Sequence, residues 1–272
     1  MSVFSVFLIT VAVIFGTVIG SFLNVVAYRV PAGISLMRES RCPGCGSPVQ
    51  WYHNIPVFSW FTLLGRCAAC DARISFRYPV VEAATGLLFG LVAWFVPLAM
   101  PLPGFAGFAV LLAFWWFAAI TVVLVLIDLD TKRLPDVIVL PSYAVGGVLL
   151  LLACLFGADW GALLRAGIGL GALYGFYALL RLVRPGGMGG GDVKLAGVAG
   201  MYLGWLGWGP LMVGGFAAFL LGGVFGIALL ASGRAQRRTA IPFGPWLLAG
   251  AWVGVLAGVR LGAWYGGLYR LY

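Results

Sequence analysis

Carboxylates are scarce in this chain, and half of them lie in two short segments where an apolar run meets a basic, polar loop. The sequence has 272 residues and eight Asp and Glu side chains. Asp128, Asp130 and Asp136 follow one apolar run, and Asp192 follows a row of glycines just before another. A carboxylate at a membrane boundary must be hydrated, paired or used in chemistry. Two such groups on one membrane face could form an acid/base pair.

The chemistry that these residue types favour is that of two aspartates sharing a proton. His53 is the only histidine, and no serine or cysteine in the loops stands beside it as a nucleophile would stand beside its base. We therefore predict that Asp128 and Asp192 form a pair. Its ionised member deprotonates a water molecule, and its neutral member protonates the scissile carbonyl or the leaving amine. The alternatives are structural: Asp192 could cap its helix, and the other acids could be solvated loop charges paired with Lys132 and Arg133.

The glycine-rich segment before Asp192 would suit an extended peptide substrate. Residues 186–191 carry almost no side chains, and glycine tolerates the positive φ angles that a sharp start of a helix can need. A peptide backbone could lie against this segment, where Gly189 and Gly191 precede the carboxylate. A plain flexible linker is the other interpretation of the same residues.

Four cysteines predict a metal site in the only sizeable polar segment, residues 28–78. This segment is too short to bury a stable core without a covalent or metal staple. Its two C-x2-C pairs match the spacing of a tetrahedral structural zinc site. A pair of disulfides is the alternative, but thiols on a cytoplasmic loop stay reduced. The predicted zinc ligands are Cys42, Cys45, Cys67 and Cys70.

Two further residues could bind a metal, but we expect a structural role for each. His53 lies between the two cysteine pairs and could replace a thiol, yet with four cysteines present we expect it to be a surface or packing residue. Cys154 stands alone within an apolar run, where we expect a small buried hydrophobe.

The elements that must position these side chains are membrane helices. The chain is 62% hydrophobic and 9% charged, and its mean hydropathy is +1.05, which excludes an ordinary soluble domain. The predicted fold is an all-α polytopic membrane protein with about eight transmembrane helices and a small zinc-stapled cytoplasmic insert. The predicted spans are residues 4–27, 79–97, 105–127, 137–156, 162–180, 193–209, 211–231 and 242–259.

The basic residues indicate how these spans are oriented. Most Lys and Arg residues fall in the segments 28–78, 128–136, 181–194 and 232–241. The positive-inside rule places these four loops in the cytoplasm. The net charge of +9 is therefore a topology signal, and we expect no nucleic-acid partner because the charges are distributed loop by loop. The predicted domains are the first span (1–27), the zinc-binding insert (28–78) and a helical bundle with the aspartates (79–272).

Six motifs in this order resemble the bacterial type 4 prepilin peptidases, which belong to the GxGD class of membrane aspartic proteases. The resemblance covers about residues 16–250. The motifs that carry it are Gly20-Ser21-Phe22-Leu23-Asn24-Val25-Val26, the two C-x2-C pairs around Asn54-Ile55-Pro56, Arg77-Tyr78-Pro79-Val80-Val81-Glu82, Ile127-Asp128-Leu129-Asp130 with Leu134-Pro135-Asp136, Gly189-Gly190-Gly191-Asp192-Val193-Lys194, and Ile241-Pro242-Phe243-Gly244-Pro245.

The resemblance implies an enzyme of the bacterial inner membrane. Such an enzyme removes the basic leader of type IV prepilins or type II secretion pseudopilins at the cytoplasmic face, and many members then N-methylate the new N-terminus with S-adenosylmethionine. The family's catalytic aspartates fall on Asp128 and Asp192, and its zinc ligands fall on the four cysteines named above. Asp130 and Asp136 match family positions with supporting roles, such as orienting Asp128 or holding the loop, and Lys194 ends the GxGD motif.

The residues that bind S-adenosylmethionine are not evident from the sequence. No Rossmann-type glycine fingerprint follows a strand, so such a site would be built from loops and span ends. The segment Gly65-Arg66-Cys67 with the first cytoplasmic loop is one candidate.

Other features have both a structural and a functional interpretation. Glu82 begins the second span, where it could offset the helix dipole, or it could meet Arg29, Arg77 or the basic leader of a substrate. The patterns Gly16-x3-Gly20 and Gly167, Gly171, Gly175 suit close helix packing, either against a substrate helix or, as we expect, within the bundle.

Two other classes of function compete with the protease. A transporter or channel could relay ions through the boundary acids and use the zinc insert for docking, but it would need polar side chains at mid-depth in several spans. The spans offer few of these. A scaffold without catalytic activity that recruits pilus assembly proteins is the second alternative.

Overall fold

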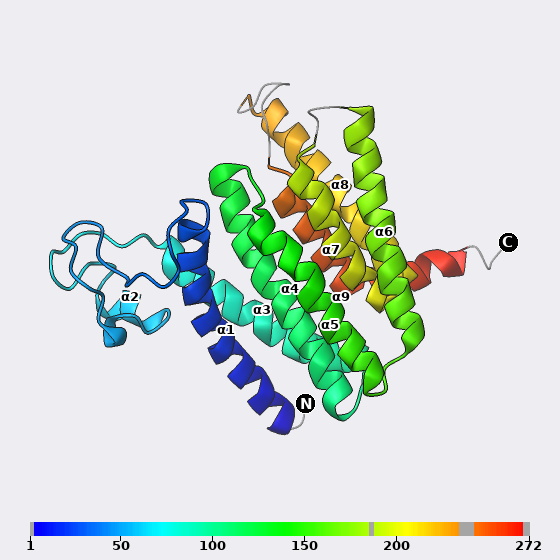
Figure 1. The fold of residues 1–272 in the computed structure, drawn as a ribbon, viewed down its shortest axis with the longest axis horizontal. Helices are drawn as coiled ribbons and strands as arrows, with labels where there is room; N and C mark the ends of the chain where they lie inside the picture. The colour runs from blue at the N-terminus through cyan, green and yellow to red at the C-terminus, as the bar shows by residue number, and fades with distance from the viewer. Residues whose placement is uncertain (1–2, 185–187, 234–241, 269–272) are drawn as a thin grey trace. The chain divides into compact units, whose positions relative to one another are not determined.

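The computed structural model describes residues 3–184, 188–233 and 242–268, and within these ranges the secondary structure is helical with no strand (Figure 1). The predicted all-α fold class is therefore confirmed. The elements are α1 (Val3–Arg29), the 3-10 helix η1 (Trp51–His53), α2 (Phe58–Thr62), α3 (Arg77–Ala99), α4 (Gly104–Thr131), α5 (Asp136–Leu155), α6 (Trp160–Val183), α7 (Gly190–Leu206), α8 (Trp208–Ala231) and α9 (Gly244–Leu268).

Seven of the described helices are long and apolar enough to cross a membrane, namely α1, α3, α4, α5, α6, α8 and α9. The remaining predicted span, 193–209, corresponds to α7, which has 17 residues and is not among these seven. The helix ends earlier than predicted because Gly207 adopts φ 138° and ψ 178°, a conformation outside the helical region that glycine tolerates. Most of the α7 residues after Asp192 are buried.

The chain divides into two compact units. The first comprises residues 1–101 and 117–123, and the second comprises residues 102–116 and 124–272. The helix α3 belongs with α1 and the polar insert in the first unit, and α4 contributes residues to both units. The predicted boundary between functional domains at residue 78 stays a prediction.

In the first unit, α1 packs along α3, and small residues allow the close approach. A Cβ on Gly16 would lie 2.7 Å from Phe89 Cβ, and one on Gly20 would lie 2.8 Å from Glu82 Cα. The expectation that the Gly16-x3-Gly20 pattern serves contact between helices of the chain is confirmed. The polar insert connects the end of α1 with the start of α3 and contains η1 and α2 (Figure 1).

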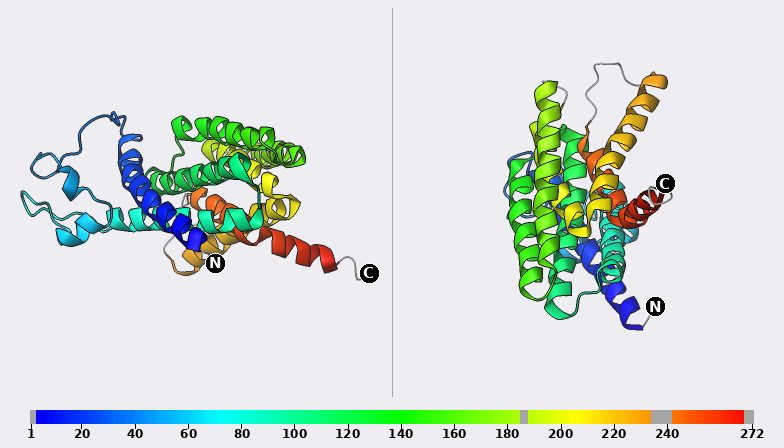
Figure 2. Two further views of the ribbon diagram at one scale, coloured as in Figure 1. Left: turned by 90° about the horizontal axis from the view of Figure 1, so that it is seen from below. Right: turned by 90° about the vertical axis from the view of Figure 1, so that its right-hand side faces the viewer.

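In the second unit, α6 packs against α7 and α8 packs against α9 (Figure 2). Backbone contact is close here as well, since a Cβ on Gly169 would meet the carbonyl of Gly200. Contact of this kind between small residues drives helix association in membranes, where lipid is as apolar as the side chains. Asp192 lies in the first turn of α7, so the packing of α6 against α7 holds the helix that carries this aspartate.

The glycine series of α6 was predicted to pack within the bundle, and this prediction is wrong. A Cβ on Gly167, Gly171 or Gly175 would meet no described atom within 4 Å. The reason is helical phase: Gly169, two residues from Gly167, is the glycine that faces α7, and residues two apart on a helix point in different directions.

Candidate functional site

Asp128 is a buried carboxylate in the last turn of α4. The residue is only 4% exposed. The backbone N–H of Gly244, at the start of α9, donates a hydrogen bond to Asp128 Oδ2 at 3.1 Å. The first N–H groups of a helix lack partners within the helix and form a natural anion-binding position. The start of α9 therefore holds this carboxylate in place.

Gly244 is a site residue that the sequence reasoning did not assign. A Cβ at this position would lie 2.6 Å from Asp128 Oδ2, so only glycine lets the carboxylate reach the amide. The ring of the neighbouring Phe243 contacts those of Phe219 at 5.5 Å and Tyr177 at 6.0 Å, measured between ring centroids. These aromatic contacts fix the backbone that donates the hydrogen bond. The motif 241–245 was the only sequence signal for this role; Ile241 itself lies outside the described residues.

Asp192 lies in the first turn of α7, a helix that is not among the candidate spans, and is half-buried. Its Oδ2 accepts a hydrogen bond from the backbone N–H of Gly189 at 3.1 Å. The structural alternative, in which Asp192 caps its helix, is wrong as to position: Gly189 is the N-cap residue, and Asp192 is the third residue of α7, whose side chain accepts from the N-cap backbone. Burial and, after it, the negative charge of Asp128 raise the pKa of Asp192 to about 6.

Leu134 connects the surroundings of the two aspartates. A Cβ on Gly191 would lie 2.7 Å from Leu134 Cβ, and a Cβ on Gly244 would lie 3.5 Å from Leu134 Cδ1. The residues next to each carboxylate therefore share a neighbour. Together with the effect of Asp128 on the pKa of Asp192, these contacts place both aspartates in one region of the second unit.

Asp136 and Lys194 form an ion pair between α5 and α7. Lys194 Nζ lies 2.7 Å from both carboxylate oxygens of Asp136. The hydroxyl of Tyr143, also on α5, donates to the backbone carbonyl of Lys194. These contacts join the N-terminal half of α5 to α7 at a residue two positions after Asp192.

The remaining predicted residues near the aspartates have different positions. Asp130 is exposed in the last turn of α4, and because it is two residues from Asp128 it points in another direction. Gly189 and Gly191 lie at the start of α7, where Gly189 donates to Asp192 and Gly191 packs on Leu134. Of the glycine-rich run, residues 186 and 187 lie outside the described ranges.

Glu82 belongs to the first unit. Its Oε2 accepts a hydrogen bond from the backbone N–H of Val57 at 2.6 Å, and the residue is 8% exposed. Val57 precedes α2 with a φ of 63°, a conformation that a β-branched residue rarely adopts. Glu82 therefore holds the insert to α3, a contact that the sequence did not indicate.

The four predicted metal ligands form one cluster in the insert. The sulfurs of Cys42, Cys45, Cys67 and Cys70 all lie within 4.8 Å of one another, and none forms a disulfide. The hydroxyl of Ser47 and then its backbone lower the pKa of Cys45 to about 6, which favours the thiolate form that a metal binds. The cluster could hold a metal ion.

Matching backbone turns build the two halves of this cluster. In the first, Cys42 N–H donates to Ser47 O and Gly46 N–H donates to Cys42 O, both at 2.9 Å. In the second, Cys67 N–H donates to Ala72 O at 2.9 Å and Asp71 N–H donates to Cys67 O at 3.0 Å. The turns aim both thiols of each pair at one point.

The two residues expected to stay outside the metal site do so. His53 is absent from the cluster and packs on the Tyr52 ring at 4.5 Å between centroids. Cys154 is buried in α5.

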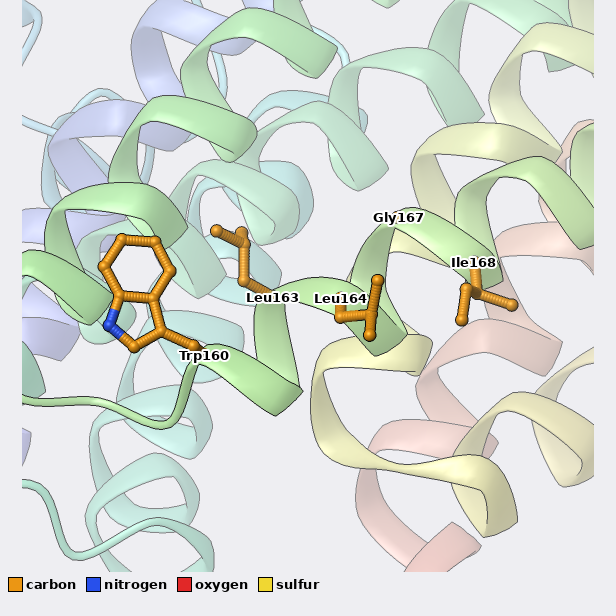
Figure 3. A pocket seen from close by; sticks show the side chains of 5 residues that line it. All are labelled: Trp160, Leu163, Leu164, Gly167 and Ile168. Carbon is orange, nitrogen blue, oxygen red and sulfur yellow. The ribbon is translucent and has the colours of Figure 1, made fainter.

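A shallow hollow on α6 is separate from these sites. It is lined by Trp160, Leu163, Leu164, Gly167 and Ile168 (Figure 3). These residues begin α6, whereas Arg181 near its end lies next to Gly190 at the start of α7. The hollow is therefore at the opposite end of α6 from Asp192.

Comparison with protein families gives two matches along the chain. The Bacterial Peptidase A24 N-terminal domain matches residues 14–96, which include the cysteine cluster. The Type IV leader peptidase family matches residues 112–227, which include both aspartates.

Comparison with individual proteins gives relatives of similar length. A prepilin leader peptidase/N-methyltransferase of Stutzerimonas stutzeri is 37% identical, covering 93% of this chain and 92% of the relative. The proteins of the same name from Pseudomonas aeruginosa and Neisseria gonorrhoeae are 35% and 34% identical, over 92% and 93% of this chain and 90% and 92% of their own. No solved structure matches the chain.

Proposed function

Because this chain belongs to the Type IV leader peptidase family, we propose that it is a membrane aspartic endopeptidase. It removes the basic leader of type IV prepilins or type II secretion pseudopilins and then N-methylates the new N-terminus. The observation that supports the protease most directly is that the charge of Asp128 raises the pKa of Asp192, while Leu134 lies beside the residues next to both carboxylates.

The proposed reaction uses the two carboxylates with one proton between them, since two close carboxylates do not both ionise readily. The ionised carboxylate takes a proton from water as the water oxygen attacks the scissile carbonyl carbon. The neutral carboxylic acid protonates the carbonyl oxygen and, in the next step, a proton passes to the leaving amine as the C–N bond breaks. The single proton is assigned to the pair and not to either aspartate, because coupled groups titrate together.

The neighbouring contacts suit this chemistry. Gly244 N–H donates to Oδ2 of Asp128 and Gly189 N–H donates to Oδ2 of Asp192, so within the described part of the chain the Oδ1 atoms stay available for water or substrate. The pair Asp136–Lys194 supports the start of α7. We assign Asp136, Lys194, Gly189 and Gly191 positioning roles, and Asp130, being exposed, a role outside the pair.

The cysteine cluster would hold zinc in a structural role. Four sulfurs about 2.3 Å from a central zinc ion lie roughly 3.8 Å apart in a tetrahedron, and the sulfurs of Cys42 and Cys70 are 3.8 Å apart. The donor set therefore fits. Four thiolates leave no open position for a substrate, so the ion would stabilise the insert.

The methyl transfer requires S-adenosylmethionine, which supplies an electrophilic methyl group when bound. The candidate segment Gly65-Arg66-Cys67 stays a prediction; the Trp60 ring lies beside Gly65, where a Cβ would be 2.7 Å from Trp60 Cζ2.

The seven candidate spans and the membrane relatives make this a multi-pass membrane protein. The proposed location is the bacterial inner membrane, with the aspartates and the insert on the cytoplasmic side. The charge distribution of the loops supports this orientation.

The test is an assay with purified, detergent-solubilised protein and a synthetic prepilin. Mass spectrometry follows loss of the leader and gain of a methyl group on the mature peptide when S-adenosylmethionine is added. The proposal expects both products. Prepilin that binds but stays uncleaved would instead support the scaffold, and ion flux in proteoliposomes without cleavage would support the transporter.

A further inference from the structure

The insert exposes a group of apolar side chains beside the start of a membrane span. We call Phe58, Phe61, Leu64 and Phe76 the apolar ridge; they are 64%, 57%, 82% and 58% exposed. Phe58 and Phe61 are three residues apart on α2 and so share a face. Phe76 directly precedes α3, a candidate span.

Trp60 joins the parts of the ridge. Its ring lies 5.3 Å from that of Phe61 and 5.2 Å from that of Phe76, between centroids. Its Nε1–H donates to the carbonyl of Ile74 at 3.1 Å. Trp60 therefore connects Phe61 with Phe76 and holds this part of the ridge against the backbone that leads into α3.

Two arginines stand next to the ridge without a counter-charge. Arg66 and Arg73 face each other in an antiparallel bridge, where side chains opposite each other lie on one face, about 5 Å apart at Cβ. Neither forms an ion pair with a described residue. Like charges in this position destabilise the bridge, so an anion between them would relieve the repulsion.

The bilayer surface is the partner that both features fit. The insert is tied at each end to a candidate span, α1 and α3, so it stays within reach of one leaflet. Aromatic side chains favour the membrane–water interface, and arginines near it are attracted to anionic lipids. The insert has two acidic residues. Glu39 pairs with Arg41 at 3.1 Å, and no ion pair between described residues joins Asp71 to Arg66 or Arg73.

We propose that the insert lies on the membrane surface, with the apolar ridge in the headgroup region and Arg66 and Arg73 bound to the phosphates of anionic lipids. This contact would orient the metal cluster relative to the leaflet, because Arg66 precedes Cys67. The inference does not depend on the protease, since it concerns only the first unit and the bilayer.

Hydrogen exchange of the full-length protein in nanodiscs tests the proposal. One set of discs contains phosphatidylcholine alone, and the other adds phosphatidylglycerol. We expect amides in residues 58–76 to exchange more slowly with phosphatidylglycerol, by up to roughly 30-fold, because each arginine near an anionic surface contributes about fivefold. Free inorganic phosphate added to the phosphatidylcholine discs should not reproduce this protection.

Two double variants with equal charge changes provide the control. Arg66→Gln with Arg73→Gln should abolish the lipid-dependent protection, whereas Arg38→Gln with Arg41→Gln should retain most of it. Phe61→Ser should weaken the protection in both kinds of disc. Metal content measured on each variant shows that the insert is still folded.

Several results would overturn the proposal. They are equal exchange in both kinds of disc, an equal loss of protection in the two arginine variants, or protection that requires added prepilin. The last result would make the ridge a substrate-binding surface instead.

Discussion

At the scale of single residues, the site depends on how closely Asp128 approaches the start of α9. The carboxylate reaches the Gly244 amide at 3.1 Å only because no side chain is present at position 244. A motif in the sequence identified both aspartates, but it did not indicate this contact. Residues 128 and 244 are far apart in the chain, and the distance between them follows from how α4 and α9 pack.

The first prediction concerns Gly244→Ala. Because a Cβ would lie 2.6 Å from Asp128 Oδ2, the carboxylate must move. A displacement of a catalytic group by about 1 Å costs about 100-fold in rate. Leader cleavage by the purified variant should fall accordingly. Gly223→Ala, on an exposed position of α8 where an added Cβ meets no described atom within 4 Å, should cleave at the wild-type rate. Equal rates for the two variants would contradict the role of Gly244.

The second prediction concerns pH. The pKa of Asp192 is raised to about 6 by burial and then by the charge of Asp128, so the side chain keeps its proton below about pH 6 and loses it above. Since the reaction needs one neutral carboxylic acid, the cleavage rate should decline as pH rises through about 6. A pH profile of kcat/KM measures this. A rate that is constant between mildly acidic and mildly alkaline pH would contradict the shared proton.

At the scale of helices and segments, an ion pair joins α5 to α7 and four thiols gather in the insert. The apolar pattern of the sequence alone does not specify these contacts. The seven candidate spans were predictable, because long apolar runs without charge favour membrane helices. The end of α7 at Leu206 was not, since it depends on the backbone of Gly207. The anchoring of the insert by Glu82 through Val57 was not predictable either, because a backbone N–H leaves no trace in the sequence.

The third prediction concerns the link between α5 and α7. Lys194→Met should lower the free energy of unfolding by about 0.5 kcal/mol, a small amount because the Asp136–Lys194 pair is partly exposed. Thermal unfolding in detergent measures this. The charge swap Asp136→Lys with Lys194→Asp should recover most of the loss, whereas no recovery would show that the attraction between the charges is not what matters.

The fourth prediction concerns the cysteine cluster. Wild-type protein should contain about one zinc ion per chain, and Cys42→Ser with Cys67→Ser should lose it, because two thiolates do not complete a tetrahedral site. Cys154→Ser should keep the ion, since that residue is buried in α5 away from the cluster. Metal analysis of purified protein measures all three. Wild-type protein with disulfides and no zinc would refute the site.

At the scale of the whole molecule, the helix ends of the second unit carry the residues that the proposed reaction uses. The end of α4 and the starts of α5, α7 and α9 carry Asp128, Asp136, Asp192 and Gly244, and contacts link them to one another. The charge pattern of the loops predicted that these helix ends share one membrane side, and motif spacing predicted the aspartates and the cysteines. Residues such as Gly244 and Leu134 were beyond sequence reasoning because their roles arise from contacts between distant segments.

The central claim is that Asp128 and Asp192 act as one catalytic unit, and cleavage rates of Asp128→Asn, Asp192→Asn and the double variant test it most directly. Residues that act as a unit give non-additive losses. With a synthetic prepilin, all three variants should show the same residual rate while expression and membrane insertion remain normal, and Asp130→Asn should stay active. Near wild-type cleavage by either single variant, or a double variant whose loss is the product of the two single losses, would contradict the claim.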